Sequence, residues 1–325
     1  MKAEAEGILK HIQDADRVVV VSHKDADGDT LGSALAMTEV IRGLGKDVVT
    51  RVPMPVPQVY GFLPGFAAIN PDEGERAPDL VVVMDASNLE RLSDTLGNLP
   101  PNTPILNIDH HVSNTRFGSL NLVVPDASST AEVTFDLLRE LGIEVSSTMA
   151  TNLYAGLLTD TGGFRHENTT FRALEIAADL VRRGADAADI AERIYKSKKL
   201  STMKLTSLVM STIGYDCDDR LVHAYVSQDL LVRSGAQMDE SEGLIDMLQS
   251  VEGLLFAVLF KEMSPELTKI SVRSRGVANA NELAAAFGGG GHARASGAEI
   301  LLPLAEAREA VLAEARRMLE HPPTA

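Results

Sequence analysis

The sequence predicts an α/β protein in which a parallel-sheet domain is joined by a helical linker to a smaller α+β domain. Three observations predict this class. In the first half, short runs of branched apolar residues alternate with longer segments of helical apolar spacing, the pattern of a parallel sheet buried on both faces. A long, charged segment of helical period follows at 185–213, and the strands and helices beyond it no longer alternate regularly. We therefore predict domains over 1–186 and 216–325, joined by a linker over 187–215.

The first domain is expected to contain buried strands connected by helices. The predicted strands, which are compact, branched and apolar, span 17–23, 46–52, 79–85 and 103–109. The segment between the first two strands has helical apolar spacing and Gly45 near its end, which suits a crossover helix. Further helices are predicted at 129–141, 147–158 and 170–183.

The second domain is expected to mix strands and helices around a smaller sheet. Its predicted strands span 221–228, 254–262, 269–275 and 297–302. Its predicted helices span 241–249, 281–287 and 303–319. This order is typical of an α+β domain.

Composition and charge restrict the function classes. The chain has 325 residues, of which 45% are hydrophobic and 23% charged, as expected for a soluble globular protein of about two domains. The net charge of −16 argues against a protein that coats long duplex nucleic acid, because such binding needs clustered Lys and Arg. A short anionic substrate stays compatible, since bound divalent cations would offset several of the carboxylates.

The sequence shows neither a membrane span nor a disulfide. No apolar run reaches the roughly 18 residues that a span requires, so we expect no membrane partner and a cytoplasmic location. Cys217 is the only cysteine, which excludes an intrachain disulfide. Its neighbours in DCDD are acidic and do not activate its thiol.

Six side chains that could bind metal fall at four separate points of the chain. They are His23, Asp27 and Asp29 in HKDADGD, Asp85 in VVVMDAS, His110 in NIDHH and Asp160 in LLTDTGG. At each point the chain leaves a buried strand or enters a polar turn, so four loops could converge at one edge of a sheet. Together these residues indicate a binuclear metal centre and therefore a metal-dependent hydrolase.

The run HKDADGD is the densest of the four points. It places Asp25, Asp27 and Asp29 at alternating positions after a strand, and packed carboxylates repel one another unless cations bind between them. A mixed shell of histidine and carboxylate suits Mn²⁺, with Mg²⁺, Co²⁺ or Zn²⁺ as alternatives. A solvated acidic turn is the structural alternative.

The other points also allow structural explanations. Asp85 could bridge two metal ions, or it could cap a helix after its strand. The side chains of His110 and His111 diverge, so one can bind metal while the other faces the substrate as an acid or a phosphate partner. Asp160 stands before two glycines, which allow either a close approach to a ligand or a purely structural turn.

Further segments could contact a substrate. FGGGGHARASG combines consecutive glycines with His292 and offers backbone N–H groups to a phosphate or base, although a flexible linker is the alternative. Between the metal-binding motifs, several polar residues could position the scissile phosphate: Asn114, Arg116, Ser128, Ser129 and Thr130. Helix capping explains the serines equally well.

Together and in order, these motifs resemble those of the DHH phosphoesterases. This family includes RecJ-type exonucleases, family II inorganic pyrophosphatases, exopolyphosphatases and NrnA-type oligoribonucleases. The spacing His-x-x-x-Asp-x-Asp, the later Asp85, the DHH triplet at 109–111 and Asp160 match the four family motifs. FGGGGHARASG resembles the DHH-associated domain of NrnA-like and RecJ-like proteins, which the pyrophosphatases lack. The resemblance covers nearly the whole chain.

The resemblance implies a role for each matching residue of the first domain. One metal ion would be held by His23, Asp27 and Asp85, and the second by Asp29, His110, Asp160 and the bridging Asp85. His111 would face the phosphate, so His111 and Asp85 are the expected catalytic residues. Ala26 stands where related proteins often have proline, but it supplies no ligand, and Asp25 matches no ligand position.

The resemblance also implies that the second domain grips the nucleotide part of the substrate. The matching residues are Gly290, Gly291 and His292. We add Arg273 in KISVRSRG as a phosphate contact, with Arg275 as a second candidate. An arginine on the surface of a strand is the structural alternative for both.

The compact two-domain chain resembles the NrnA type rather than RecJ, which carries additional domains. The expected activities are release of 5′-mononucleotides from short oligoribonucleotides (nanoRNA) or short single-stranded DNA, and removal of the 3′-phosphate from adenosine 3′,5′-bisphosphate (pAp). The expected cofactors are two divalent metal ions, with Mn²⁺ favoured over Mg²⁺ or Co²⁺. Hydrolysis of pApA or cyclic dinucleotides is the nearest alternative, followed by polyphosphate or pyrophosphate hydrolysis and by a noncatalytic nucleotide sensor. A homodimer is compatible with the resemblance.

Overall fold

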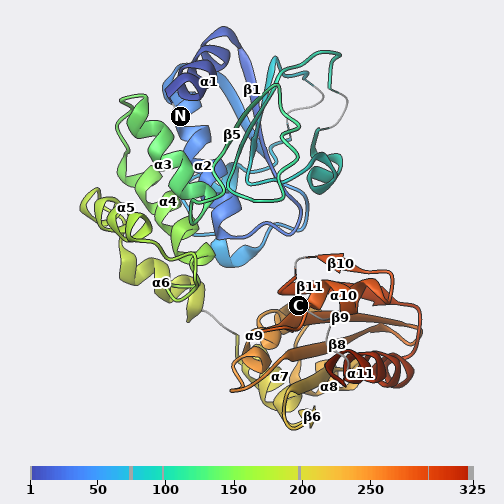
Figure 1. Cartoon of the computed structure of the whole chain (residues 1–325). Coiled ribbons are helices and arrows are strands. Elements are labelled where there is room, and N and C mark those ends of the chain that lie inside the picture. Colours follow the sequence, from blue (N-terminus) through green and yellow to red (C-terminus); the bar gives the residue numbers. More distant parts are fainter. Residues whose placement is uncertain (1, 73–75, 97–98, 197–198, 292, 321–325) are drawn as a thin grey trace. The chain divides into compact units, whose positions relative to one another are not determined.

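The computed structural model describes residues 2–72, 76–96, 99–196, 199–291 and 293–320 (Figure 1). The chain separates into two compact units, Met1–Ser197 and Lys198–Ala325, and the division falls within the segment that the sequence predicts as a linker. In that segment, α6 (Ala187–Tyr195) packs against α4 (Ser147–Asp160) of the first unit. The next helix, α7 (Leu200–Met210), packs against α8 (Gln228–Ser234) of the second unit. The predicted linker segment thus contributes one helix to each unit.

The first unit is built on a parallel sheet of five strands in the order β2-β1-β3-β4-β5. The strands are β1 (Arg17–Ser22), β2 (Asp47–Arg51), β3 (Leu80–Met84), β4 (Ile105–Asp109) and β5 (Leu120–Val123). The sheet confirms the predicted α/β class and the predicted strands. The additional strand β5 was not predicted, because its short sequence LNLV lies mostly half-buried at an edge and has no long apolar run.

Helices cover one face of this sheet (Figure 1). They are α1 (Lys2–Asp14), α2 (Gly28–Gly43) and α3 (Thr130–Glu140), whereas α4 packs on α2 and α3, and α5 (Phe171–Arg182) packs on α4. Val18 and Val20 of β1 belong to the core under these helices, whereas Val19 and Val21 belong to a smaller cluster on the other face. That cluster includes Leu92 of η3 (Leu89–Leu96). Because β1 is buried on both faces, it is apolar throughout and holds the start of α2 in a fixed place at its carboxyl end.

The second unit contains a mixed sheet in the order β10-β11-β9-β8-β7-β6. The strands are β6 (Gly214–Asp216), β7 (Leu221–Val226), β8 (Phe256–Ser264), β9 (Leu267–Ser274), β10 (Gly290–Gly291) and β11 (Ala295–Ile300). Alternate residues of β7 and β8 face opposite cores, and Ile270 and Val272 of β9 pack on one face with α10 (Ala280–Ala285) and α11 (Leu304–Glu320). The other face packs with α7, α8 and α9 (Leu244–Gln249). None of the helices among the described residues has the length and apolar character needed to cross a membrane.

Candidate metal centre

The end of β1 and the start of α2 bring three of the predicted ligands together. His23 directly follows β1 and is only 4% exposed. Asp27 caps α2, because its Oδ1 accepts the N–H of Thr30 at 2.9 Å. Asp29 lies buried in the first turn of the same helix. Asp27 therefore caps this helix and also belongs to the predicted ligand set.

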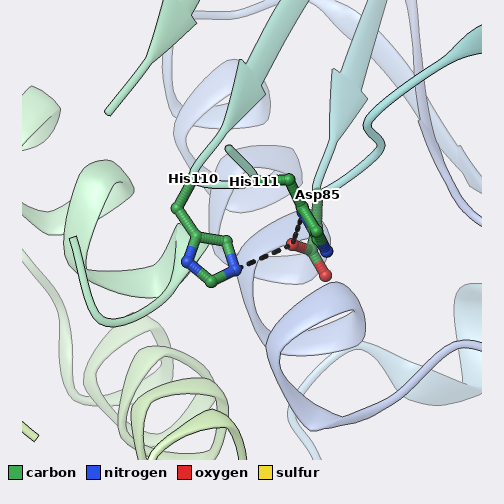
Figure 2. Close-up of side chains that lie close together, drawn as sticks. All are labelled: Asp85, His110 and His111. Atoms are coloured by element: carbon green, nitrogen blue, oxygen red, sulfur yellow. Dashed lines mark ion pairs between the residues drawn. The ribbon is translucent and has the colours of Figure 1, made fainter. Parts of the chain in front are cut away.

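Asp85 lies between the histidines of the site. It follows β3, is 2% exposed and has a left-handed backbone with φ of 61°. Its Oδ2 lies 3.4 Å from His23 Nε2. Its Oδ1 lies 3.8 Å from His110 Nε2 and 3.6 Å from His111 Nδ1, as Figure 2 shows. A carboxylate whose two oxygens face different histidines has the geometry of a bridging ligand.

Three overlapping groups of side chains have the arrangement of a metal site. In each group, one ligand atom from every member lies within 4.8 Å of the others. The groups are His23, Asp27 and Asp85; Asp29, His110 and Asp160; and Asp85, His110 and His111. All six ligands proposed from the sequence lie in these groups, and Asp85 and His110 each belong to two. The fold thus brings together residues that lie far apart in the sequence.

Burial and crowding shift the pKa values of the carboxylates. Burial and the charges of neighbouring carboxylates raise the pKa of Asp29 well above its usual value. Burial also raises the pKa of Asp160 to about 7, although the charge of His110 opposes this shift. Burial favours the neutral form of Asp85 too, but the hydrogen bond and charge of His23 outweigh it and lower the pKa of Asp85. The cluster of carboxylates and imidazoles, with its mutual repulsion, therefore fits divalent cations.

The two adjacent histidines are held in different ways. His110 Nδ1 lies 3.2 Å from the carbonyl oxygen of Ala127, which leaves Nε2 facing Asp85 and Asp160. His111 Nδ1 instead lies 2.7 Å from Oδ1 of the fully buried Asp109. Burial opposes protonation of His111, but the hydrogen bond with Asp109 and the charge of Asp85 raise its pKa. In the same way, Asp85 outweighs burial and raises the pKa of His23.

Two threonines orient the carboxylates, and the sequence did not single them out as partners of Asp85. Thr30 Oγ1 lies 2.7 Å from Asp85 Oδ2 and 2.8 Å from His23 Nε2. Thr130 Oγ1 donates to Asp85 Oδ1 at 2.8 Å, and its N–H donates to Asp29 at 2.7 Å. Thr30 could have been noticed as a hydroxyl directly after the acidic run. The sequence indicates Thr130 only as a helix-start residue near the scissile phosphate, because its contact with Asp85, 45 positions away, has no local signal.

Other residues proposed from the sequence are not members of the ligand groups. The hydroxyl of Ser129 accepts the N–H of Glu132 at 3.1 Å and caps α3. Arg116 is exposed, has φ of 52° and makes no described contact with the ligand groups. Asp25 is also outside these groups and has φ of 60°.

Within the second unit, the glycine run and Arg273 lie on two strands of the same sheet, β10 and β9, which β11 separates. Arg273 of β9 pairs with Ala295 of β11, and its Nε lies 3.4 Å from Asp246 Oδ1. Gly290 and Gly291 form β10 and pair with β11. A Cβ atom on Gly291 would lie 2.7 Å from the carbonyl oxygen of Ala295, so the close backbone approach requires glycine there. His292 lies outside the described residues.

Comparisons with known proteins agree over both units. The model described as DHH family, N-terminal domain, matches residues 17–157, and the DHHA1 domain model matches residues 218–321. A Thermus thermophilus protein named bifunctional oligoribonuclease and PAP phosphatase NrnA is 34% identical over 322 residues, which cover 98% of this chain and 94% of that protein. A Bacillus subtilis protein of the same name is 29% identical over 304 residues, covering 92% and 93%.

A solved structure is similar over the full length as well. The crystal structure of an exopolyphosphatase-related protein from Bacteroides fragilis has a TM-score of 0.89 and 27% sequence identity, covering 99% of this chain and 98% of that one. The identity of 34% over nearly the whole chain, together with the matches to the two domain models, means that the chain belongs to the DHH family.

Proposed function

We propose that this chain is a metal-dependent phosphoesterase that cleaves short oligoribonucleotides to 5′-mononucleotides and removes the 3′-phosphate of pAp. The observation that carries the reaction class is the position of Asp85, whose two oxygens face histidines of different ligand groups. The substrate class is supported by the names of the relatives from Thermus thermophilus and Bacillus subtilis. It is also supported by the DHHA1 domain in the second unit.

Two divalent cations fit the residues present, with Mn²⁺ favoured by the mixture of imidazole and carboxylate ligands. His23, Asp27 and Asp85 would hold one cation. Asp29, His110 and Asp160 would hold the other, with Asp85 as the common ligand. When bound, such cations supply Lewis-acid chemistry: they activate water and neutralise charge on phosphoryl oxygens. The crowded carboxylates support this assignment, since burial and the charges of neighbouring carboxylates raise the pKa values of Asp29 and Asp160, and a cation would offset both effects.

The chain's own side chains then have distinct tasks. Thr30 and Thr130 donate to opposite oxygens of Asp85 and fix the plane of its carboxylate. Asp109 holds His111 through Nδ1, so that the Nε2 of His111 is left to contact a phosphoryl oxygen or to give a proton to the leaving oxygen. Asp109 is itself held by the amide of Asn114 at 2.5 Å. The imidazole of His111 is therefore oriented before the substrate arrives.

The second unit supplies the proposed contacts with the nucleotide. Arg273 would bind a phosphate, and Gly290 and Gly291 would offer backbone beside it, together with His292. Arg116 in the first unit is exposed and free to reach a phosphate, whereas the hydroxyl of Ser129 is already engaged in capping. We further propose that long duplex nucleic acid is not a substrate, because the net charge of −16 opposes binding along many phosphates.

We also propose that the chain forms a homodimer, and light scattering would test this.

The proposal is tested with the full chain stripped of metal and reloaded with Mn²⁺, Mg²⁺, Co²⁺ or Zn²⁺. A time course would follow pAp, pApA, RNA and DNA from dinucleotides upward, cyclic di-AMP and pyrophosphate. We expect mononucleotides from the short RNA and adenosine 5′-monophosphate (AMP) from pAp, with Mn²⁺ the most effective ion. Strong hydrolysis of pyrophosphate without cleavage of any dinucleotide would overturn the proposed substrate class.

A further inference from the structure

A pocket of about 980 Å³ lies next to the metal-binding groups in the first unit. It is formed at the carboxyl ends of β1 and β2, by the loop after β1, the segment after β2 and parts of η2 (Phe66–Ala68) and η3. Lys24 lines the pocket and directly follows His23, and its carbonyl oxygen lies 2.5 Å from His23 Nδ1. The pocket and the ligand groups therefore share one loop at the same edge of the sheet. Its volume suits a small-molecule ligand.

Two cationic side chains line this pocket, and no carboxylate among the described residues pairs with either of them. Arg51 ends β2 and is half-buried, and Lys24 is exposed. Neither forms an ion pair with any residue that the structure describes. Asp25 is the single carboxylate among the described lining residues. Unpaired lysine and arginine beside a phosphoesterase centre favour a second phosphate group at this position.

The remaining wall of the pocket is largely apolar. Met54, which lines the pocket, is 75% exposed and is therefore accessible to a ligand. Phe66 and Ile69 line the pocket as well, and both are packed against the core from behind. The cationic side chains suit a phosphate, and the neighbouring apolar and aromatic side chains suit a base. This combination is typical of sites that bind nucleotides.

Hydrogen bonds hold the wall in place before any ligand binds. The side chain of Asn70 accepts the N–H of Val52 and donates to the carbonyl oxygen of Val52, both at 2.9 Å. The N–H of Asn70 donates to the carbonyl oxygen of Thr50 at 2.9 Å. These bonds tie the start of the segment after β2 to its end. A preformed pocket binds a ligand without an ordering cost.

We propose that this pocket binds a second nucleotide unit of an oligonucleotide substrate. Its phosphate would contact Lys24 and Arg51, and its base would lie on Phe66 and Met54. The inference rests on the proposed function, in which the second unit of the chain contacts one nucleotide. Because pAp contains a single nucleoside, the pocket contributes to the binding of substrates with two or more nucleotides. It therefore favours these substrates over pAp.

The kinetic test uses Arg51→Gln, which removes a cation without touching the ligand loop. We expect the ratio of KM for pApA to KM for pAp to rise by about tenfold, because one charge-assisted hydrogen bond is lost. Met54→Ser changes an exposed side chain, so its folding is not at issue, and it should raise the ratio in the same direction. Arg42→Gln, at the far end of α2, is the matched control and should leave the ratio unchanged. An unchanged ratio in Arg51→Gln and Met54→Ser overturns the inference.

A binding test separates this inference from the proposed function. Calorimetric titration of the full chain in EDTA with pApA and with AMP requires no turnover. We expect Arg51→Gln to bind pApA about tenfold more weakly than the wild type, with a smaller effect on AMP. If Arg51→Gln weakens the binding of pApA and of AMP equally, the pocket binds a free mononucleotide and the inference is overturned. Undetectable binding of pApA to the wild type also overturns it. A wild type that binds pApA but cleaves no substrate with any metal contradicts the proposed function instead.

Discussion

His111 Nδ1 lies 2.7 Å from Asp109 Oδ1, and this contact determines which nitrogen of His111 can reach a substrate. The buried carboxylate also favours the protonated imidazole. We expect Asp109→Asn to lower kcat on the order of a hundredfold, with little change in KM. The reason is that the neutral amide of asparagine does not stabilise the protonated imidazole of His111. The pH profile of kcat is the deciding measurement. If His111 acts as an acid, activity falls as pH rises through its pKa, and the variant should shift that fall to lower pH.

The control for this prediction is another carboxylate that pairs with a cation away from the site. Asp136 forms an ion pair with Arg172 and contacts none of the ligand groups. Asp136→Asn should leave the pH profile unchanged. A pH profile for Asp109→Asn that coincides with that of the wild type would show that Asp109 has a structural role only.

Replacement of the shared carboxylate should affect metal binding and turnover together. We expect Asp85→Asn to lower kcat/KM by at least about a hundredfold. Because metal bound only by the folded state stabilises it, Mn²⁺ should raise the Tm of the wild type more than that of the variant. Thermal unfolding at increasing Mn²⁺ is the measurement. Asp47→Asn, at the opposite end of the sheet, is the control, and full activity in Asp85→Asn would refute the assignment of the bridge.

Removal of metal should make stability depend on pH in a definite direction. The pKa of Asp160 is raised to about 7, so the folded chain holds a proton that the unfolded chain releases near its ordinary value. The resulting stabilisation is complete at low pH and is lost as pH rises through about 7. The raised pKa values of His23 and His111 act in the same direction.

The corresponding measurement is the Tm in EDTA between about pH 6 and about pH 8. We expect the Tm to fall over this interval and the fall to be smaller in Asp160→Asn. Saturating Mn²⁺ should suppress the dependence, since bound cations replace the protons. A Tm in EDTA that rises with pH would contradict the electrostatic account of the site.

The sequence predicted the long buried elements well and the short or exposed ones poorly. The strand β1 was found because it is buried on both faces and therefore apolar throughout. The helix α1 was missed because its charged residues hide a narrow buried stripe at Ala5, Ile8 and Ile12, whose spacing could have revealed it. The two-residue strand β10 exists only through its pairing with β11 and has no pattern of its own.

The candidate site shows the same division between local and distant information. Its proposed ligands could be named because strands ending in Asp or His are unusual and repeat along the chain. The orienting contacts could not be named in the same way. Thr130 reaches Asp85 only because α3 begins beside the ends of β1 and β3, and no local pattern encodes that placement.

A second pH dependence is expected in the second unit, with the opposite sign. His223 of β7 is 8% exposed, and its Nδ1 has no hydrogen-bond partner among the described residues. Burial, followed by the charge of Arg308, lowers its pKa, so protonation favours the unfolded chain. Stability should therefore fall as pH drops below about 6.5. His223→Leu should weaken this dependence in urea unfolding monitored in the second unit, while His11→Gln in the first unit should not.

The backbone of Asp85 has a consequence for the evolution of this protein. A left-handed conformation at a residue with a side chain is strained by about 1 to 3 kcal/mol. Glycine adopts this conformation without strain, so the aspartate is retained at a position that glycine would occupy more easily. The presence of the aspartate at this strained position indicates that it is retained for catalysis and not for stability. Screens for heat-resistant variants should accordingly return substitutions of Asp85 that raise the Tm and abolish catalytic activity.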